Sequence, residues 1–193
     1  MRKKRKLVHG VGVNDADYVV CGKVNGKRVW CPYYKTWAHM LMRAYCERFH
    51  ESNPAYADVT VCAEWLAFMT FREWMEGEDW EGRALDKDII VQGNREYSPD
   101  RCLFVSQAVN NLLCNCANDR GEYPCGVSKH RGGKYRAHVR IYGKLKILGY
   151  FDTVNEAEQV YKKAKKAHIE VIAATQTDAR IRDGLLRHAD LLV

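Results

Sequence analysis

The residues best placed to do chemistry lie in one stretch near the middle of the chain, ALDKDIIVQGNREYSPDRCLFV (residues 84–105). Asp86 and Asp88 flank Lys87, and Asn94 follows in a predicted Gly-Asn turn between two strand-like runs. Hard cations such as Mg²⁺ take oxygen ligands, so the two acids could hold one such ion. A single acidic pair is also common on a solvated hairpin. The candidate catalytic residues are Asp86, Lys87, Asp88 and Asn110, and the candidate metal ligands are Asp86, Asp88 and Asn94.

Hydrolysis by a metal ion also needs a general base that activates water, and histidine is the usual one. The chain has no histidine between Ala84 and Lys129. Lys87 is a poor base at neutral pH, since the reference pKa of lysine is about 10.4. The spacing of His39 and the other upstream histidines assigns none of them to this stretch. Two hypotheses therefore stay open: a metal-dependent nuclease, and a hairpin of the same shape that lacks the catalytic base.

A second group of candidate residues is basic. The net charge of the chain is +7, which favours a polyanionic partner, usually nucleic acid. The segment from Lys129 to Lys146 is rich in Lys, Arg and His and contains no acid. In its run KYRAHVRI, basic and apolar residues alternate, so the sequence predicts a strand with one buried face and one open basic face. A three-stranded sheet is narrow enough to enter the DNA major groove, which is about 12 Å wide.

An α+β fold of two modules is predicted to position these residues. The first module is predicted to contain a β-hairpin at Asn25-Gly26, a helix over 36–52 capped by Thr36, a strand over 57–62, a helix over 63–77, the hairpin of 84–105 and a helix over 107–118 capped by Ser106. The second is predicted to contain strands over 125–130, 134–141 and 144–151, a helix over 153–174 with the capping box Thr153 and Glu156, and a further helix within 177–193.

The motifs of the first module resemble those of bacteriophage proteins described as HNH-endonuclease-like. TWAHMLMRAY, DVTVCAEWLAFMTFREWM, LDKDIIVQGNREYSPDRCLFV and QAVNN follow one another over roughly residues 36–113. Members typically read W-x-x-M-x-x-R, then v-C-x-x-W-x-x-F-x-x-F, then L-D-[RK]-[ID], then Y-S-P-x-x-C-x-[WF]-V, then an Asn. The resemblance implies a degenerate ββα module with flanking helices. It also implies one Mg²⁺-like ion on Asp86, Asp88 and Asn110, although the expected histidine is replaced within Leu85-Asp86-Lys87-Asp88.

The motifs of the second module resemble the APETALA-two/ethylene-response-factor (ERF) DNA-binding domain, over about 45 residues. The matching elements are Gly126-Val127, Ala137 to Arg140, Leu148 to Phe151, Asp152-Thr153 and Glu156-Ala157 through Tyr161. The resemblance implies a three-stranded antiparallel sheet packed on one helix. Ser128 and His130 stand where the plant domains have arginines, and Ile147 where they have a tryptophan, so the plant recognition sequence does not transfer. The candidate DNA-binding residues are Ser128, His130, Arg131, Lys134, Arg136, His138, Arg140, Lys144 and Lys146.

Domain boundaries follow from these patterns. We expect a basic arm over residues 1–10, an HNH-endonuclease-like module over 11–118, an ERF-like domain over 119–174 and a C-terminal helix or tail over 175–193. The eight cysteines include one C-x-C pair, Cys114 and Cys116, which is a weaker zinc signal than two C-x-x-C pairs. We expect no structural zinc, and we interpret most of the cysteines as small buried hydrophobic residues.

The expected partner is double-stranded DNA, and the oligomeric state is not predicted. No apolar run is long enough for a membrane span and no secretory signal is found, so the expected location is the cytoplasm, as a phage protein in its bacterial host. Three functions stay open: a homing-type endonuclease, a catalytically inactive DNA-binding or regulatory protein, and a phage interaction protein that inhibits a host defence or processing enzyme.

Overall fold

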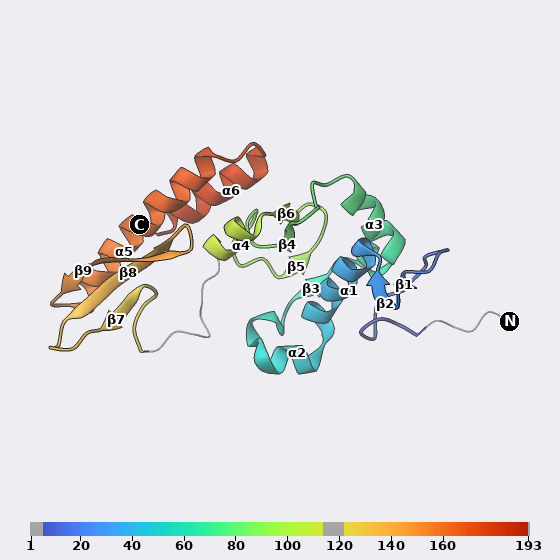
Figure 1. The fold of residues 1–193 in the computed structure, drawn as a ribbon, viewed down its shortest axis with the longest axis horizontal. Helices are drawn as coiled ribbons and strands as arrows, with labels where there is room; N and C mark the ends of the chain where they lie inside the picture. Colours follow the sequence, from blue (N-terminus) through green and yellow to red (C-terminus); the bar gives the residue numbers. More distant parts are fainter. Residues whose placement is uncertain (1–5, 114–121, 193) are drawn as a thin grey trace. The chain divides into compact units, whose positions relative to one another are not determined.

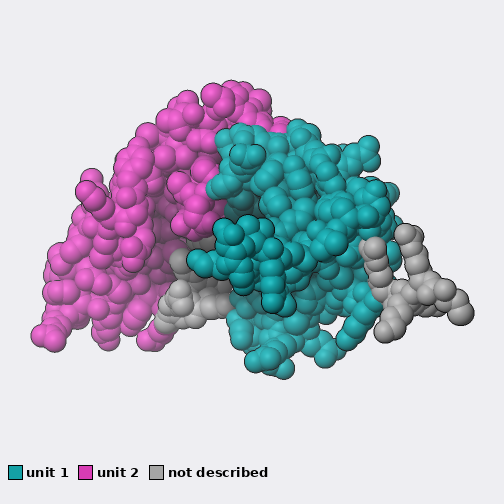
Figure 2. Space-filling view, turned by 45° about the vertical axis from the view of Figure 1, so that its right-hand side comes forward, with its two compact units in different colours: residues 1–105 teal, residues 106–193 magenta. Residues whose placement is uncertain are grey.

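The computed structural model of the chain describes residues 6–113 and 122–192. The fold is α+β and divides into two units, residues 1–105 and residues 106–193 (Figures 1 and 2). Within the described residues, every helix is too short or too polar to cross a membrane.

The helices of unit 1 build its core. Helix α1 (Pro32–Tyr45) is followed by the short helix α2 (Glu47–Ser52) and the 3₁₀ turn η1 (Pro54–Tyr56). The 3₁₀ turn η2 (Ala63–Leu66) leads into helix α3 (Phe68–Glu76). Trp37 of α1 is fully buried and its indole N–H donates to the Trp65 carbonyl at 2.7 Å, which joins the two helical segments. Phe68, Phe71 and Met75 form the buried side of α3.

Two predictions about the first helix are wrong. The predicted helix over 36–52 is broken at Cys46, whose extended backbone (φ −96°, ψ 105°) separates α1 from α2. The helix also begins earlier, at Pro32, whose fixed φ and missing N–H suit the first helical position. Thr36 is therefore inside the helix, and its hydroxyl donates to the Pro32 carbonyl at 3.1 Å instead of capping the N-terminus.

The predicted hairpin of 84–105 is a long loop closed by a short strand pair. Strand β4 (Ala84–Asp86) pairs antiparallel with β6 (Leu103–Val105). Strand β5 (Glu96–Tyr97) pairs parallel with β3 (Thr60–Val61), so the predicted strand over 57–62 is only two residues long. Ile89 to Val91 form no strand; Ile89 is buried inside the loop, whereas Val91 is exposed.

Strands β1 (Cys21–Val24) and β2 (Lys27–Trp30) form the predicted β-hairpin near the N-terminus. Its two turn residues, Asn25 (φ 51°) and Gly26 (φ 76°), both adopt the left-handed conformation, as a type I′ turn requires. The strands pair only with each other among the described residues.

Unit 2 begins with helix α4 (Gln107–Leu113), where the Ser106 hydroxyl accepts the Val109 N–H at 3.2 Å, as predicted for an N-cap. The rest of the helix predicted over 107–118 lies outside the described residues. The predicted three-stranded antiparallel sheet is confirmed, in the order β7 (Val127–Lys129), β8 (Tyr135–Ile141), β9 (Lys144–Phe151).

Helix α5 (Val154–Ala174) covers one face of this sheet and packs against helix α6 (Ala179–Asp190) (Figure 1). The capping box is confirmed, because the Thr153 hydroxyl accepts the Glu156 N–H and the Glu156 carboxylate accepts the Thr153 N–H. Val127, Ala137 and Ala157 are buried between sheet and helix.

Candidate functional site

Asp86 ends strand β4, and its carboxylate turns back onto the chain that follows. Its Oδ1 accepts hydrogen bonds from the backbone N–H groups of Asp88 (2.9 Å) and Ile89 (2.8 Å). This is the geometry of an Asx turn, in which a carboxylate replaces a backbone acceptor and bends the chain. Burial raises the pKa of Asp86, and the two backbone N–H groups offset part of that rise.

Lys87 is a buried cation, with only 7% of the residue exposed. Its Nζ donates to both carboxylate oxygens of Asp88, each at 2.9 Å, and to the backbone carbonyl of Asn94 at 2.6 Å. An ammonium group has three donor hydrogens, and here three oxygens surround it. The loop between β4 and β5 therefore closes around the side chain of Lys87.

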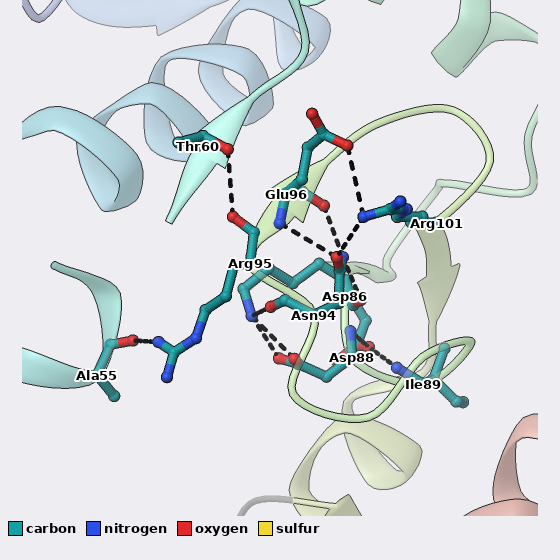
Figure 3. A network of polar contacts seen from close by, with 10 residues as sticks. Ala55, Thr60, Asp86, Asp88, Ile89, Asn94, Arg95, Glu96 and Arg101 are labelled. Atoms are coloured by element: carbon teal, nitrogen blue, oxygen red, sulfur yellow. Dashed lines mark hydrogen bonds and ion pairs between the residues drawn. The ribbon is translucent and has the colours of Figure 1, made fainter. Parts of the chain in front are cut away.

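The side chain of Asn94 holds the other end of the same loop by hydrogen bonds (Figure 3). Its Nδ2 donates to the carbonyls of Lys87 (2.9 Å) and Glu96 (2.6 Å). Its Oδ1 accepts the Glu96 N–H at 3.1 Å and Arg101 Nη1 at 3.3 Å. Asn94 is buried, and both the donor and the acceptor atoms of its side chain are satisfied within the protein.

These contacts decide whether the candidate ligands fit a divalent cation. Asp86 Oδ1, both oxygens of Asp88 and Asn94 Oδ1 are already hydrogen-bonded to protein groups. The positive charge of Lys87 lies among them, where a metal ion would meet electrostatic repulsion. Among the described residues, no three His, Cys, Asp or Glu side chains are grouped as metal ligands would be. The arrangement does not fit a divalent cation.

Asn110, the fourth candidate catalytic residue, belongs to helix α4 of unit 2, whereas Asp86, Lys87 and Asp88 belong to unit 1. The backbone N–H of Asn110 donates to the Ser106 carbonyl at 3.0 Å, as a residue in the first turns of a helix does. Within unit 1, the structure brings together the two acids, the lysine and Asn94 as one internal network.

Arg43 is a residue of this region that the sequence did not single out. It follows the buried residues Trp37 and Met40 at helical spacing on α1, so its side chain points toward the interior. Burial raises the pKa of Tyr97, and the positive charge of Arg43 beside its phenol opposes that rise. Arg43 also attracts the Asp86 carboxylate. The arginine in the motif W-x-x-M-x-x-R was the signal that could have identified it.

The raised pKa of Asp86 predicts a pH-dependent difference between the wild type and Asp86→Asn. An acid whose folded-state pKa lies above its ordinary value of 3.8 binds its proton more tightly in the folded protein, so its contribution to stability falls as pH rises through that interval. Asparagine keeps the oxygen that accepts the Asp88 and Ile89 N–H groups but does not titrate. We expect the variant to gain stability relative to the wild type as pH rises above 3.8, measured by urea denaturation followed by tryptophan fluorescence.

Asp86→Ala is the control for this experiment, because alanine removes the acceptor as well as the charge. Loss of hydrogen bonds to two partly buried N–H groups should cost about 1–3 kcal/mol across the whole pH range. A difference between wild type and Asp86→Asn that does not change with pH would contradict the assigned environment of Asp86.

The candidate DNA-binding residues of strand β8 lie on the sheet face opposite helix α5. Arg136, His138 and Arg140 alternate with the buried residues Ala137 and Val139, as the sequence predicted. Directly paired residues of neighbouring antiparallel strands share a face. The register therefore adds residues from β9 to this open face: Tyr150 beside Arg136, Ile147 beside His138, and Leu145 beside Arg140. We call these six residues the open face.

Sequence reasoning missed the apolar half of the open face. Leu145, Ile147 and Tyr150 are all exposed. A register shift opposite Ala137 and His138 places one extra residue in β9. This β-bulge brings Tyr150 onto the same face as Ile147 although they are three positions apart, an odd spacing that simple alternation assigns to opposite faces.

The other candidate DNA-binding residues are distributed around the sheet. Ser128 is paired with Arg136, and its hydroxyl accepts the Arg136 Nε–H at 3.2 Å. The His130 ring lies 4.6 Å from the Tyr150 ring, centroid to centroid, and Lys134 forms an ion pair with Asp152 at 3.0 Å. Arg131 is exposed in the turn that follows β7.

Lys144 and Lys146 lie on the other side of the sheet from the arginines. They pair with Ile141 and Val139, whose side chains face helix α5, but both lysines are exposed at the edge formed by β9. They can reach a phosphate beside the sheet edge, but they do not extend the row of Arg136, His138 and Arg140.

His138 is the least satisfied polar residue of the open face. Its Nδ1 is buried and has no hydrogen-bond partner among the described residues. Burial lowers the pKa of His138, and the positive charges of Arg136 and Arg140 lower it further. A negative charge over this face would oppose that lowering, because it favours the imidazolium form.

The described cysteines include no cluster of zinc ligands. Cys102 is buried in the core of unit 1, where burial raises the pKa of its thiol to about 12. Cys125 lies in unit 2 with its Sγ 3.1 Å from the Tyr161 hydroxyl. Cys114 and Cys116, the C-x-C pair, lie outside the described residues.

The chain was compared with models of known protein families, with curated proteins and with solved structures, and none of the three comparisons gave a match.

Proposed function

We propose that the protein binds double-stranded DNA through the open face of its three-stranded sheet. The observation that carries the proposal is the row of Arg136, His138 and Arg140 on a face that no described element of unit 2 covers. Arginine can bind guanine O6 and N7 bidentately or contact a phosphate, and apolar side chains contact the thymine methyl group. The mixed basic and apolar open face offers both kinds of contact.

The orientation of the guanidinium groups supports the same proposal. Arg136 is held by the Ser128 hydroxyl, and Arg140 Nη1 donates to the Gly143 carbonyl at 3.3 Å. Within the described residues, neither arginine forms an ion pair with an acid, whereas Lys134 does. Their charges are thus available to an anion, and their side chains are partly ordered before binding, which lowers the entropic cost of contact.

In this proposal unit 1 has no catalytic role at the loop of Asp86 to Asn94. The contacts of Lys87 with Asp88 and Asn94 satisfy the groups that a nuclease would direct at a metal ion and a phosphate. We expect purified protein to leave plasmid DNA intact with Mg²⁺ or Mn²⁺. Metal-dependent cleavage that disappears in Asp88→Ala would overturn this part of the proposal and restore the nuclease hypothesis.

The open face is tested by Arg136→Gln together with Arg140→Gln. Binding of the full chain to a fluorescent mixed-sequence duplex is measured by anisotropy over a range of NaCl concentrations. Each lost phosphate contact should reduce the slope of log K against log salt by about 0.9. A lost bidentate base contact should instead cost about 1–3 kcal/mol at unchanged slope, and only on duplexes that contain the recognised base.

The matched control is Arg180→Gln together with Arg182→Gln on helix α6. These arginines form ion pairs with Asp178 and Asp183, and their replacement removes the same two charges from the same unit. If both double variants bind DNA alike, net charge and not the open face determines binding, and the proposal fails. If the protein instead binds a protein partner, independently of salt, and does not bind DNA, the hypothesis of a phage protein that inhibits a host enzyme is favoured.

A further inference from the structure

The β1–β2 hairpin is exposed on both of its faces. All four residues of β2 are exposed, as are three of the four residues of β1. Its exposed apolar side chains include Val24 (57%), Val29 (49%) and Trp30 (42%). A two-stranded hairpin alone in water is marginally stable, and stable sheets bury at least one face. Trp30 stacks on Tyr34 of helix α1, with 5.7 Å between the ring centroids, but the packing of unit 1 does not explain Lys23, Val24, Lys27 and Arg28.

The charges of the hairpin are all of one sign. Lys23, Lys27 and Arg28 lie within six residues, and the whole segment from Tyr18 to Cys46 contains no acidic residue. None of the three forms an ion pair within the described part of the chain. On the adjoining helix α1, Lys35 and His39 are also exposed. Burial lowers the pKa of His39, and the nearby positive charge of Lys35 lowers it further.

The register of the hairpin places two positive side chains directly opposite each other. Lys23 pairs directly with Arg28. Side chains of directly opposite residues share a face with Cβ atoms about 4.5–5.5 Å apart, and like charges there are destabilising. An anion between the ammonium and the guanidinium would turn this repulsion into two attractions. The spacing and the absence of any acid point to a phosphate backbone as that anion.

We propose that the β1–β2 hairpin is a second DNA-binding element, which places double-stranded DNA against unit 1 as well as unit 2. Two strands about 4.8 Å apart form a ribbon that the major groove, about 12 Å wide, can admit. Lys23 and Arg28, which share one face of the ribbon, bind phosphates, and Lys27 beside the turn can reach a further phosphate from the opposite face, which it shares with Val24 and Val29. The choice of DNA as partner rests on the proposed function, whereas the surface is independent of the open face.

The test uses the full chain with Lys23, Lys27 and Arg28 all replaced by Gln, in the same anisotropy assay. The control removes three exposed positive charges elsewhere on unit 1, by Arg48→Gln, Arg83→Gln and Arg95→Gln. We expect the hairpin variant to reduce the slope of log K against log salt by up to about 2.7, at about 0.9 for each phosphate. The charge-conserving variant Lys23→Arg with Lys27→Arg should keep the wild-type slope. A variant in which the hairpin had lost its structure would show a reduced slope.

The outcomes separate this proposal from the proposed function. If the hairpin variant matches its control while Arg136→Gln with Arg140→Gln weakens binding, the hairpin proposal is wrong and the open face stands. If only the hairpin variant weakens binding, the hairpin stands and the open face is wrong. If neither differs from its control, both fail. Tighter binding to duplex RNA would also overturn the hairpin proposal, because side chains cannot read the narrow major groove of A-form RNA.

Discussion

Replacing Gly126 with alanine is expected to destabilise unit 2 by about 3–5 kcal/mol, the largest effect expected of any single change in this unit. Gly126 has φ +75°, and a Cβ there would overlap the ring of Tyr161 on helix α5. The strain of the left-handed backbone and the displacement of the ring therefore add. The Gly126 carbonyl also accepts the His138 N–H at 2.8 Å, so the strain reaches strand β8.

Gly132→Ala is the matched control for this prediction. Gly132 has φ +93° in the turn between β7 and β8, but no atom lies within 4 Å of the position that an added methyl group would take. Only the backbone cost of about 1–2 kcal/mol should therefore appear. Adding Tyr161→Ala to Gly126→Ala should recover part of the loss. Equal effects of Gly126→Ala and Gly132→Ala would show that contact with Tyr161 has no part in the instability.

The measurement can separate the two units. All five tryptophans, Trp30, Trp37, Trp65, Trp74 and Trp80, lie in unit 1. Tryptophan fluorescence therefore reports unit 1, whereas far-ultraviolet circular dichroism reports both units. Gly126→Ala should shift part of the dichroism transition to lower urea concentration and leave the fluorescence transition in place.

Lys87→Met should instead destabilise unit 1. We expect its free energy of unfolding, followed by tryptophan fluorescence, to fall by about 2–4 kcal/mol. Methionine fills a similar volume but leaves the buried Asn94 carbonyl and the Asp88 carboxylate without the ammonium that they accept from. The loss is smaller than for a fully buried ion pair, because the Asp88 side chain is 42% exposed and water can replace part of the contact.

Two variants test the cause of that loss. Arg101→Met removes a cation from the same network, but the Arg101 side chain is half exposed, so the expected cost is about 0–1 kcal/mol. Lys87→Met combined with Asp88→Asn should be more stable than Lys87→Met alone, since the carboxylate that lost its ammonium partner is then neutral. If Lys87→Met is no worse than Arg101→Met, the lysine does not hold the loop together.

Unit 2 was largely predictable because its signals are local. Alternation within KYRAHVRI assigned the two faces of β8, and the Thr153–Glu156 capping box fixed the start of α5. The β-bulge at Leu148 was missed, although the neighbouring Gly149, a glycine inside a strand, is the kind of residue that often marks one. The bulge places Tyr150 on the open face, whereas Leu145 and Ile147 lie there by simple alternation.

Unit 1 was less predictable because its elements depend on distant partners. Strand β5 forms only because it pairs with β3, in which Thr60 lies opposite Glu96 although the two are far apart in the sequence. No local sequence pattern indicates such a parallel pair. The apolar run around Ile89 predicts a strand, but Ile89 is the buried anchor of a loop. The structure places the side chains of Asp88 and Asn94 close to Lys87, but the contacts of Lys87 with these residues cannot be deduced from spacing.

The position of strand β9 has a consequence for self-association. Within the part of the chain that the structure describes, β9 is the last strand of its sheet, and an edge strand presents backbone N–H and C=O groups to which a second chain could add a strand. Lys144 and Lys146 stand on this strand, and its bulge interrupts the regular ladder. Charged residues and bulges are two of the devices by which proteins block edge-to-edge aggregation. Lysines at such an edge disfavour strand addition by a second chain, whether or not they also bind a phosphate.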